Sequence, residues 1–228
     1  MKKSFLIAAL AALSLGTAQA AEVDWTYANT TPTTTAGKTA ITAVTGSATF
    51  ATTVTLSGNI GSGTLLAINN GANGSKNRVT IGVTDDGKWQ FAGYNWSGNA
   101  NIQDVTWTAG EAPAVTAGTY VLGLTITAND GGTSTMVFSV NGQQFATFTG
   151  TLQDGDINYL LWDQAYERPT DSEAMFGYSG DATFNDIYYL NGEALAPNEL
   201  YAAVLPEPTA LALLALGVAG VALRRRVA

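Results

Sequence analysis

The chain has 228 residues, a formal net charge of −8, and neither cysteine nor histidine. The two missing residue types exclude disulfide cross-links, thiol nucleophiles, Ser-His-Asp catalysis and histidine-ligated zinc. Five of the ten basic and one of the 18 acidic residues lie in the terminal segments, so the portion between them carries about −12 and excludes a nucleic-acid partner, which would need basic patches.

The first twenty residues have the three parts of a secretory signal peptide. Lys2 and Lys3 form a basic start, Phe5–Leu15 is apolar, and Ala18-Gln19-Ala20 is an Ala-x-Ala cleavage site. We expect a signal peptide over residues 1–20, cleavage after Ala20 and export by the Sec pathway. A retained N-terminal anchor is the alternative.

Residues 21–46 are expected to form an N-terminal strand and a threonine-rich segment. Asn29–Thr45 has little charge and surrounds Pro32. Such a stretch is typical of an extended linker or an edge segment, and its threonine content also suits β-structure.

From residue 47 the chain becomes a series of short segments with period-two alternation, separated by Gly, Asn and Asp. Asn141-Gly142 and Asp86-Gly87 are hairpin signals, each between two such segments. A single short helix is expected at Pro197–Val204. The expected strands cover Ala48–Leu56, Thr64–Asn69, Val79–Thr84, Lys88–Tyr94, Tyr120–Ile126, Met136–Val140, Phe145–Leu152, Ile157–Trp162 and Ala182–Leu190.

Evenly spaced strands with short turns predict an all-β sandwich or jelly roll. No internal repeat of fixed period is visible, which argues against a propeller or a β-helix. The expected sandwich occupies residues 47–205.

Two stretches resemble concanavalin A-like, laminin-G-like domains. Thr135–Phe148 is similar to the central hairpin of such domains, and Phe184–Leu200 is similar to their closing strand and the short helix after it. The resemblance implies a jelly-roll sandwich of about ten to twelve strands.

Concanavalin A-like folds include glycosidases, whose laminarinase-type members carry a Glu-x-Asp-x-(x)-Glu strand that aims an acid and a nucleophile into one cleft. This sequence has no such run. The nearest acidic spacings fall in segments with Gly, Pro or Ser, where solvated loop carboxylates are expected and no catalytic residue is predicted. They are Asp154/Asp156, Asp163/Glu167 and Asp171/Glu173.

No cofactor is certain from the sequence, and calcium is the one candidate. Asp154 and Asp156 lie between two expected strands, and loop carboxylates are the oxygen ligands that calcium uses. The EF-hand pattern is absent. The two aspartates are therefore candidate calcium ligands, with solvated loop acids as the alternative.

Aromatic residues supply the candidate glycan-binding set. Tyr94, Asn95 and Trp96 belong to a segment rich in Gly, Asn and Ser that reads as a loop, and Tyr166 follows a later strand. Aromatic faces stack on sugar rings and amides bond hydroxyl groups. Two further tryptophans, Trp89 and Trp162, alternate within strands and are expected in the core.

The C-terminal segment, residues 206–228, has three ordered parts. Pro206-Glu207-Pro208 is a rigid polar strip, Thr209–Leu223 is an uncharged apolar run, and Arg224-Arg225-Arg226 is a basic stop. As a helix the run would be about 22 Å long, short of the roughly 30 Å hydrocarbon core, so snorkelling arginines or local thinning would complete the span. The arginines favour a cytoplasmic C-terminus, with everything before Pro206 outside.

This arrangement resembles the PEP-CTERM sorting signal. The resemblance implies handling by an exosortase, a membrane protease and transpeptidase that would cut near Pro206, and a cell-surface or extracellular-matrix setting. Together with the middle of the chain it predicts an exported protein, anchored by its C-terminal helix before release to the envelope, that is not an enzyme and binds glycan or exopolysaccharide. A glycoside hydrolase-like enzyme and a purely structural coat protein without ligand are the alternatives.

Overall fold

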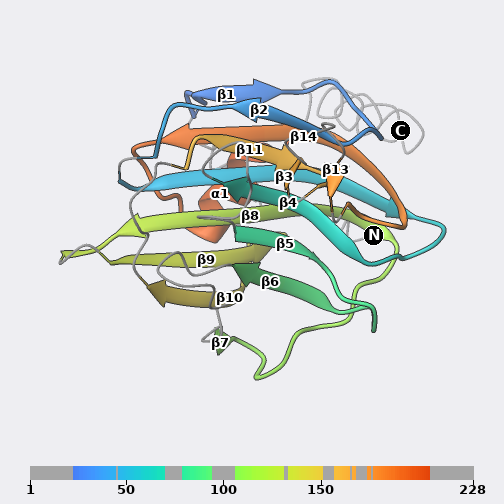
Figure 1. Ribbon diagram of the computed structural model, residues 1–228. Coiled ribbons are helices and arrows are strands. Elements are labelled where there is room, and N and C mark those ends of the chain that lie inside the picture. Colours follow the sequence, from blue (N-terminus) through green and yellow to red (C-terminus); the bar gives the residue numbers. More distant parts are fainter. Residues whose placement is uncertain are drawn as a thin grey trace, which may run out of the picture.

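Two large antiparallel sheets make up most of the described part of the molecule in the computed structural model (Figure 1). The structure describes residues 23–44, 46–69, 79–93, 106–130, 133–150, 157–164, 166–167, 174–175 and 177–205. Every neighbouring pair of strands in these ranges is antiparallel, which short turns between sequential strands favour.

The first sheet has seven strands. Their spatial order is β1 (Tyr27–Asn29), β14 (Asp181–Asn191), β3 (Ala48–Ser57), β8 (Gly118–Ala128), β9 (Ser134–Val140), β10 (Gln143–Gly150) and β7 (Thr106–Trp107). The long strands β14, β3 and β8 are the middle of this sheet, and both of its edges are strands of two or three residues. Short edges give another chain little backbone to pair with.

The second sheet has five strands and is followed in the chain by a small hairpin. Its order is β2 (Gly37–Ala40), β11 (Tyr159–Trp162), β4 (Gly63–Asn69), β5 (Val79–Val83) and β6 (Trp89–Gly93). The hairpin pairs β12 (Tyr166–Glu167) with β13 (Ala174–Met175).

The predicted all-β sandwich is confirmed, with twelve strands in the two sheets of the described part. The predicted helix is α1, with the same bounds, Pro197–Val204. The threonine-rich stretch Asn29–Thr45 contributes edge strand β2 and the last residue of edge strand β1, so the edge alternative holds there and the linker alternative is wrong. The expected signal peptide and tail helix lie outside the described residues.

Aromatic rings fill the space between the sheets. Phe138 is fully buried and lies 5.9 Å from Trp89 and 5.8 Å from Phe91 between ring centroids, with Trp107 at 6.3 Å and Phe145 at 6.0 Å. These tilted and edge-on contacts are the arrangements that aromatic quadrupoles favour. The core position predicted for Trp89 is confirmed.

Trp162 is also a core residue, as predicted, and it holds an edge strand in place. Its side chain is 9 % exposed, and its indole N–H donates to the carbonyl of Thr35 at 3.1 Å. A Cβ on Gly37 would lie 2.3 Å from the Trp162 ring, so only glycine lets β2 approach this closely. The sheet edge therefore depends on one tryptophan and one glycine.

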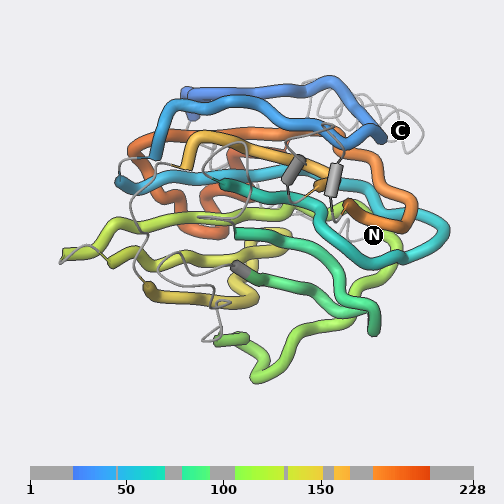
Figure 2. Tube along the Cα trace, in the orientation of Figure 1, coloured from blue at the N-terminus to red at the C-terminus, as the bar shows by residue number. Residues whose placement is uncertain are grey.

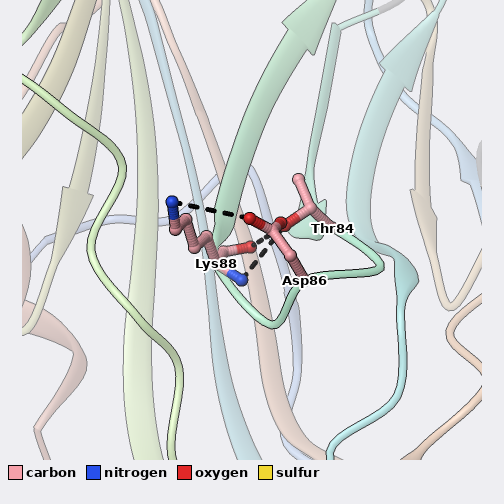
Figure 3. Close-up of polar contacts among 3 residues, drawn as sticks. All are labelled: Thr84, Asp86 and Lys88. Carbon is pink, nitrogen blue, oxygen red and sulfur yellow. Dashed lines mark hydrogen bonds and ion pairs between the residues drawn. The ribbon is translucent and has the colours of Figure 1, made fainter.

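Both predicted hairpin turns are present. Asn141 (φ 49°) and Gly142 (φ 79°) adopt the positive φ values that a two-residue turn requires, and they join β9 to β10. In the turn between β5 and β6, the Thr84 hydroxyl donates to the Asp86 carboxylate and accepts the Lys88 amide at 3.0 Å (Figure 3). The hydrogen bond from Thr84 lowers the pKa of Asp86.

Helix α1 lies against the outer face of the seven-stranded sheet, where it contacts β3, β8 and β10. Leu200 and Val204 are buried there, with exposed fractions of 1 % and 4 %. Gly123 makes room for the helix, because a Cβ at this position would lie 3.0 Å from a Leu200 methyl group. The apolar residues under α1 form a cluster separate from the core between the sheets.

Tyr189 ties the segment before β3 to β14, and its removal tests this link. The ring stacks on Phe50 at 4.9 Å, its hydroxyl donates to the Thr42 carbonyl at 2.8 Å, and burial raises its pKa to about 12. Tyr189→Phe should lower the free energy of unfolding of residues 21–205 by about 0.5–1.5 kcal/mol, because the hydrogen bond to the Thr42 carbonyl is lost. Urea unfolding measures the change.

Tyr27→Phe is the matched control, since Tyr27 lies on edge strand β1 and is only half-buried. It should change the free energy of unfolding by less than about 0.5 kcal/mol. Equal effects of the two substitutions would contradict a specific role for the Tyr189 hydrogen bond.

Candidate functional site

Most of the residues predicted to carry function lie outside the described part of the chain. This holds for Tyr94, Asn95 and Trp96 of the glycan-binding set, for the candidate calcium ligands Asp154 and Asp156, for the signal cleavage residues Ala18 and Ala20, and for the sorting-motif residues Pro206, Glu207, Pro208, Arg224, Arg225 and Arg226. Tyr166 starts β12, whose backbone alone is described. The described strands nevertheless fix where the chain enters and leaves these segments.

The strands before two of the predicted segments end at the same end of the sandwich: β6 before Tyr94–Trp96, and β10 before Asp154 and Asp156. Gly93, the last residue of β6, pairs with Val79, and Gly150, the last of β10, pairs with Ser134. The amide of Val44, four residues before β3 begins, donates to Ile157 just before β11, which brings the corresponding ends of the two sheets together. The arrowheads of β6 and β10 point to the left in Figure 1, and Figure 2 shows the same chain path. We call this the β6/β10 end.

Tyr166 follows the opposite end of the sandwich. It comes after Trp162, the last residue of β11, which pairs with Gly37 and Leu66 at the far end of the five-stranded sheet from Gly93. The strands before Tyr94–Trp96 and before Tyr166 thus end on opposite sides. The sequence grouped the four residues only by their chemistry. The strand order shows that the chain runs to Tyr94–Trp96 from one end of the sandwich and to Tyr166 from the other.

The described residues at the β6/β10 end include a buried polar atom that sequence reasoning did not identify. The side-chain oxygen Oδ1 of Asn158 is buried and has no hydrogen-bond partner within the described residues. Its backbone is fully used, because the amide donates to Asn69 at 3.0 Å and the carbonyl accepts from Ile41 at 2.9 Å. An orphaned buried acceptor marks a place for a donor such as a hydroxyl group or a water.

Tyr159, the next residue, adds an aromatic surface to this end. Its ring is half-buried, and the ammonium group of Lys38 lies 5.7 Å from the ring centroid. The two residues lie on β11 and β2, which pair directly. An aromatic ring can stack on a sugar, and the ammonium group beside it can bond hydroxyl groups. Asn158 and Tyr159 are adjacent on an extended segment, so their side chains point to opposite faces of it.

At the opposite end, Asp163 corrects one expectation from the sequence. This carboxylate was expected to be a solvated loop acid, but it is half-buried, and burial raises its pKa above the usual range. Its backbone adopts φ 53°, and its Oδ1 accepts the Tyr178 amide at 2.8 Å. Sequence reasoning missed this because the burial comes from a segment fifteen residues away.

Two acids at this end, Asp163 and Asp181, bind backbone groups instead of forming a reactive pair. Asp163 holds Tyr178, while Asp181 Oδ2 accepts the Asn59 amide at 3.2 Å and the Tyr178 hydroxyl accepts the Gly61 amide at 3.1 Å. These bonds attach the loop between β3 and β4 to the segment before β14. Within the described residues no group of three or more Asp and Glu side chains could hold a metal ion.

A family model for the PEP-CTERM protein-sorting motif matches residues 204–226. The chain carries a PEP-CTERM sorting motif. This confirms the resemblance seen in the sequence, and the motif implies an exosortase-sorted surface protein. In the described part of residues 23–205 no helix is long and apolar enough to cross a membrane. No curated protein matches the chain.

Several solved structures are similar to the chain. The CBM40 module of the Ruminococcus gnavus IT-sialidase, bound to α2,3 sialyllactose, is 14% identical over 72% of this chain and 84% of that one, with a TM-score of 0.48. The heptameric SAP-like pentraxin of Limulus polyphemus is 14% identical over 75% of both chains, with a TM-score of 0.49. The Trypanosoma rangeli sialidase is 14% identical over 72% of this chain but only 23% of its own length, with a TM-score of 0.47.

Asp163 offers a test of the burial described above. A carboxyl group whose pKa is raised on folding stabilises the fold fully at low pH, and this contribution is lost as pH rises from the unfolded pKa through the folded one. Asp163→Asn keeps an acceptor for the Tyr178 amide and tolerates positive φ. We expect it to match or exceed the parent in free energy of unfolding at pH 7, and to show a flatter pH dependence between about pH 4 and pH 7.

Asp163→Ala is the control, because it removes the same charge and also the acceptor. It should lower the free energy of unfolding by about 1–3 kcal/mol. Urea unfolding at several pH values compares the three proteins. A parent more stable than Asp163→Asn at neutral pH would contradict the raised pKa.

Proposed function

We propose that the protein is an exported surface or extracellular-matrix component that an exosortase sorts and that binds glycan without catalysing a reaction. The sorting motif at residues 204–226 carries this proposal. The signal-peptide pattern at residues 1–20 supports export, and the apolar run Thr209–Leu223 supports temporary anchoring in a membrane.

The sequence and the described acids support a role without catalysis. The absence of histidine and cysteine removes imidazole general bases and thiol nucleophiles. Among the described carboxylates, Asp163 and Asp181 bind backbone amides on separate segments. A retaining glycosidase instead needs two carboxyl groups about 5 Å apart across a cleft.

The β6/β10 end supports glycan binding. The segment with Tyr94, Asn95 and Trp96 begins directly after Gly93, at the end where Tyr159 and the orphaned oxygen of Asn158 lie. Aromatic faces and amide groups together suit a neutral or basic sugar chain. The net charge of about −12 on the exported portion disfavours strongly acidic polymers.

The sorting step predicts a defined change in mass. In a bacterium that has an exosortase, the exported protein should lose its signal peptide and then the residues after the sorting motif. In the same strain without the exosortase it should keep the tail and stay in the membrane fraction. Intact mass and fractionation measure both events, and an identical mass in the two strains would contradict sorting by this enzyme.

Glycan binding is tested on residues 21–205 with an array of bacterial polysaccharides. We expect binding to at least one neutral polymer, and Trp96→Ala should weaken it by about tenfold or more. Tyr166 is the predicted binding residue that follows the opposite end of the sandwich, and Tyr166→Ala should weaken binding less than Trp96→Ala if the β6/β10 end holds the glycan. Product release from β-glucans would favour the glycoside hydrolase alternative, and silence on every polymer would favour the structural coat protein.

A further inference from the structure

Helix α1 and the sorting motif overlap in the chain. The motif match begins at Val204, which is the last residue of α1 and is only 4 % exposed. The amide of Leu205 still bonds to the Tyr201 carbonyl at 3.1 Å, and Pro206 follows at once. The described fold therefore continues to Leu205, and no spacer separates it from Pro206 of the sorting motif.

This junction limits how far the motif can extend from the folded body. Four residues, 205–208, separate Val204 from the start of the apolar run at Thr209. Fully extended, they span at most about 14 Å. The exported portion has a radius of gyration of about 16 Å for its length. A body this wide, so close to the membrane, would obstruct a membrane enzyme that acts on the motif.

The docking of α1 is built so that the helix can leave without disturbing the main core. Leu200 and Val204 pack on Ala51, Val121, Leu190 and Leu195, in a cluster separate from the core between the sheets. Only Leu200 and Val204 of the helix are buried. A helix of eight residues is marginal in water by itself, so it unfolds when it leaves the sheet. Its residues would then lengthen the free segment to about 40 Å.

The hydrogen bonds before α1 set the limit of this opening. The buried hydroxyl of Thr49 donates to the Glu193 carbonyl at 2.9 Å and accepts the Leu195 amide at 2.9 Å. These bonds fix the chain to β3 just before the helix. The segment that can open therefore starts at Ala196, and the strands remain paired.

Resting on the proposed sorting function, we infer that α1 is a release element: the exosortase gains access to the motif only when α1 leaves the outer face of the seven-stranded sheet. The stability of α1 docking then sets the rate of tail removal. Local opening of a weakly held element is a common low-energy excursion of folded proteins.

A disulfide that locks α1 tests this directly, because the chain has no cysteine of its own. An ideal Cβ on Gly142 lies 3.1 Å from the Cβ of Tyr201, somewhat closer than the about 3.5–4.5 Å found in disulfides. Because φ is 79° at Gly142, a side chain there strains the turn, and the Gly142→Cys single variant measures that effect separately. The double variant Gly142→Cys with Tyr201→Cys should lose its tail far more slowly than the parent in an exosortase-bearing host. Each single variant is a control that has one of the side-chain changes without the bond.

Two further variants distinguish a motif that the exosortase cannot reach from a motif that it no longer recognises. A Gly-Ser-Gly-Ser insertion between Leu205 and Pro206 should restore tail removal in the locked protein, because it supplies the missing length. Leu200→Ala, without the lock, should raise the open population and the initial rate of tail removal by about tenfold or more. Pulse-chase with detection of the tail-bearing and tail-free forms measures these rates.

The outcomes distinguish the two proposals. Equal rates for the parent, the locked protein and the insertion variant would overturn the release role of α1 while leaving sorting intact. No tail removal in any variant, insertion included, would instead overturn sorting. Hydrogen exchange on residues 21–205 needs no exosortase: α1 amides should exchange through local opening, faster than those of β3, and equal protection would also overturn the release role.

Discussion

Burial of β3 on both of its faces is the constraint on which the architecture depends. Phe50 and Val54 point into the core between the sheets, while Ala51 lies under α1 in the second cluster. The strand pairs along its length with β14 and β8, the other two long strands. A strand covered on both faces needs small or apolar residues outside as well as inside. Ala51 and, on β8, Gly123 meet this need, and a Cβ on Gly123 would crowd both Ser139 and, on the helix, Leu200.

Two buried threonines of β3 hold neighbouring segments by hydrogen bonds. Thr49 and Thr52 are fully buried, and their hydroxyls donate to the carbonyls of Glu193 and Asp186. A buried hydroxyl without a partner would cost free energy, so these two bonds allow polar residues in the centre of the molecule. They also fasten β14 and the chain after it to β3. The route from the last strand to α1, and so the position of the sorting motif, follows from these contacts.

Local patterns predicted the elements of this fold well, because strands and turns are encoded by neighbouring residues. The Asn141-Gly142 turn followed from the two residues that tolerate positive φ, and α1 from Pro197 at its start and Glu199 in its first turn. Strand order is decided by contacts between distant segments. For this reason the sequence could not show that the strands before Trp96 and before Tyr166 end on opposite sides.

In the candidate site, too, local sequence patterns predicted some features, while others depend on contacts between distant segments. Tyr94, Asn95 and Trp96 were predicted to bind glycan because the composition of their segment is typical of a loop, and this stays a prediction. Asn158 was not, since nothing in its neighbours shows that its side-chain oxygen is buried with no partner among the described residues. Asp163 was misjudged for a related reason: its flanking residues suggest a solvated loop, and the burial that raises its pKa comes with the contact to Tyr178.

Separate placement of the two apolar clusters connects the fold with delivery to the cell surface. The core between the sheets can hold the sandwich together whether α1 is docked or released, because Leu200 and Val204 belong only to the second cluster. The strand before Tyr94–Trp96 ends with Gly93 at the β6/β10 end, whereas α1 lies across the outer face of the seven-stranded sheet. Opening of the helix would therefore leave the inter-sheet core and the strands that carry the candidate loops in place. A protein that must be processed at one surface and bind at another gains from keeping these two surfaces mechanically independent.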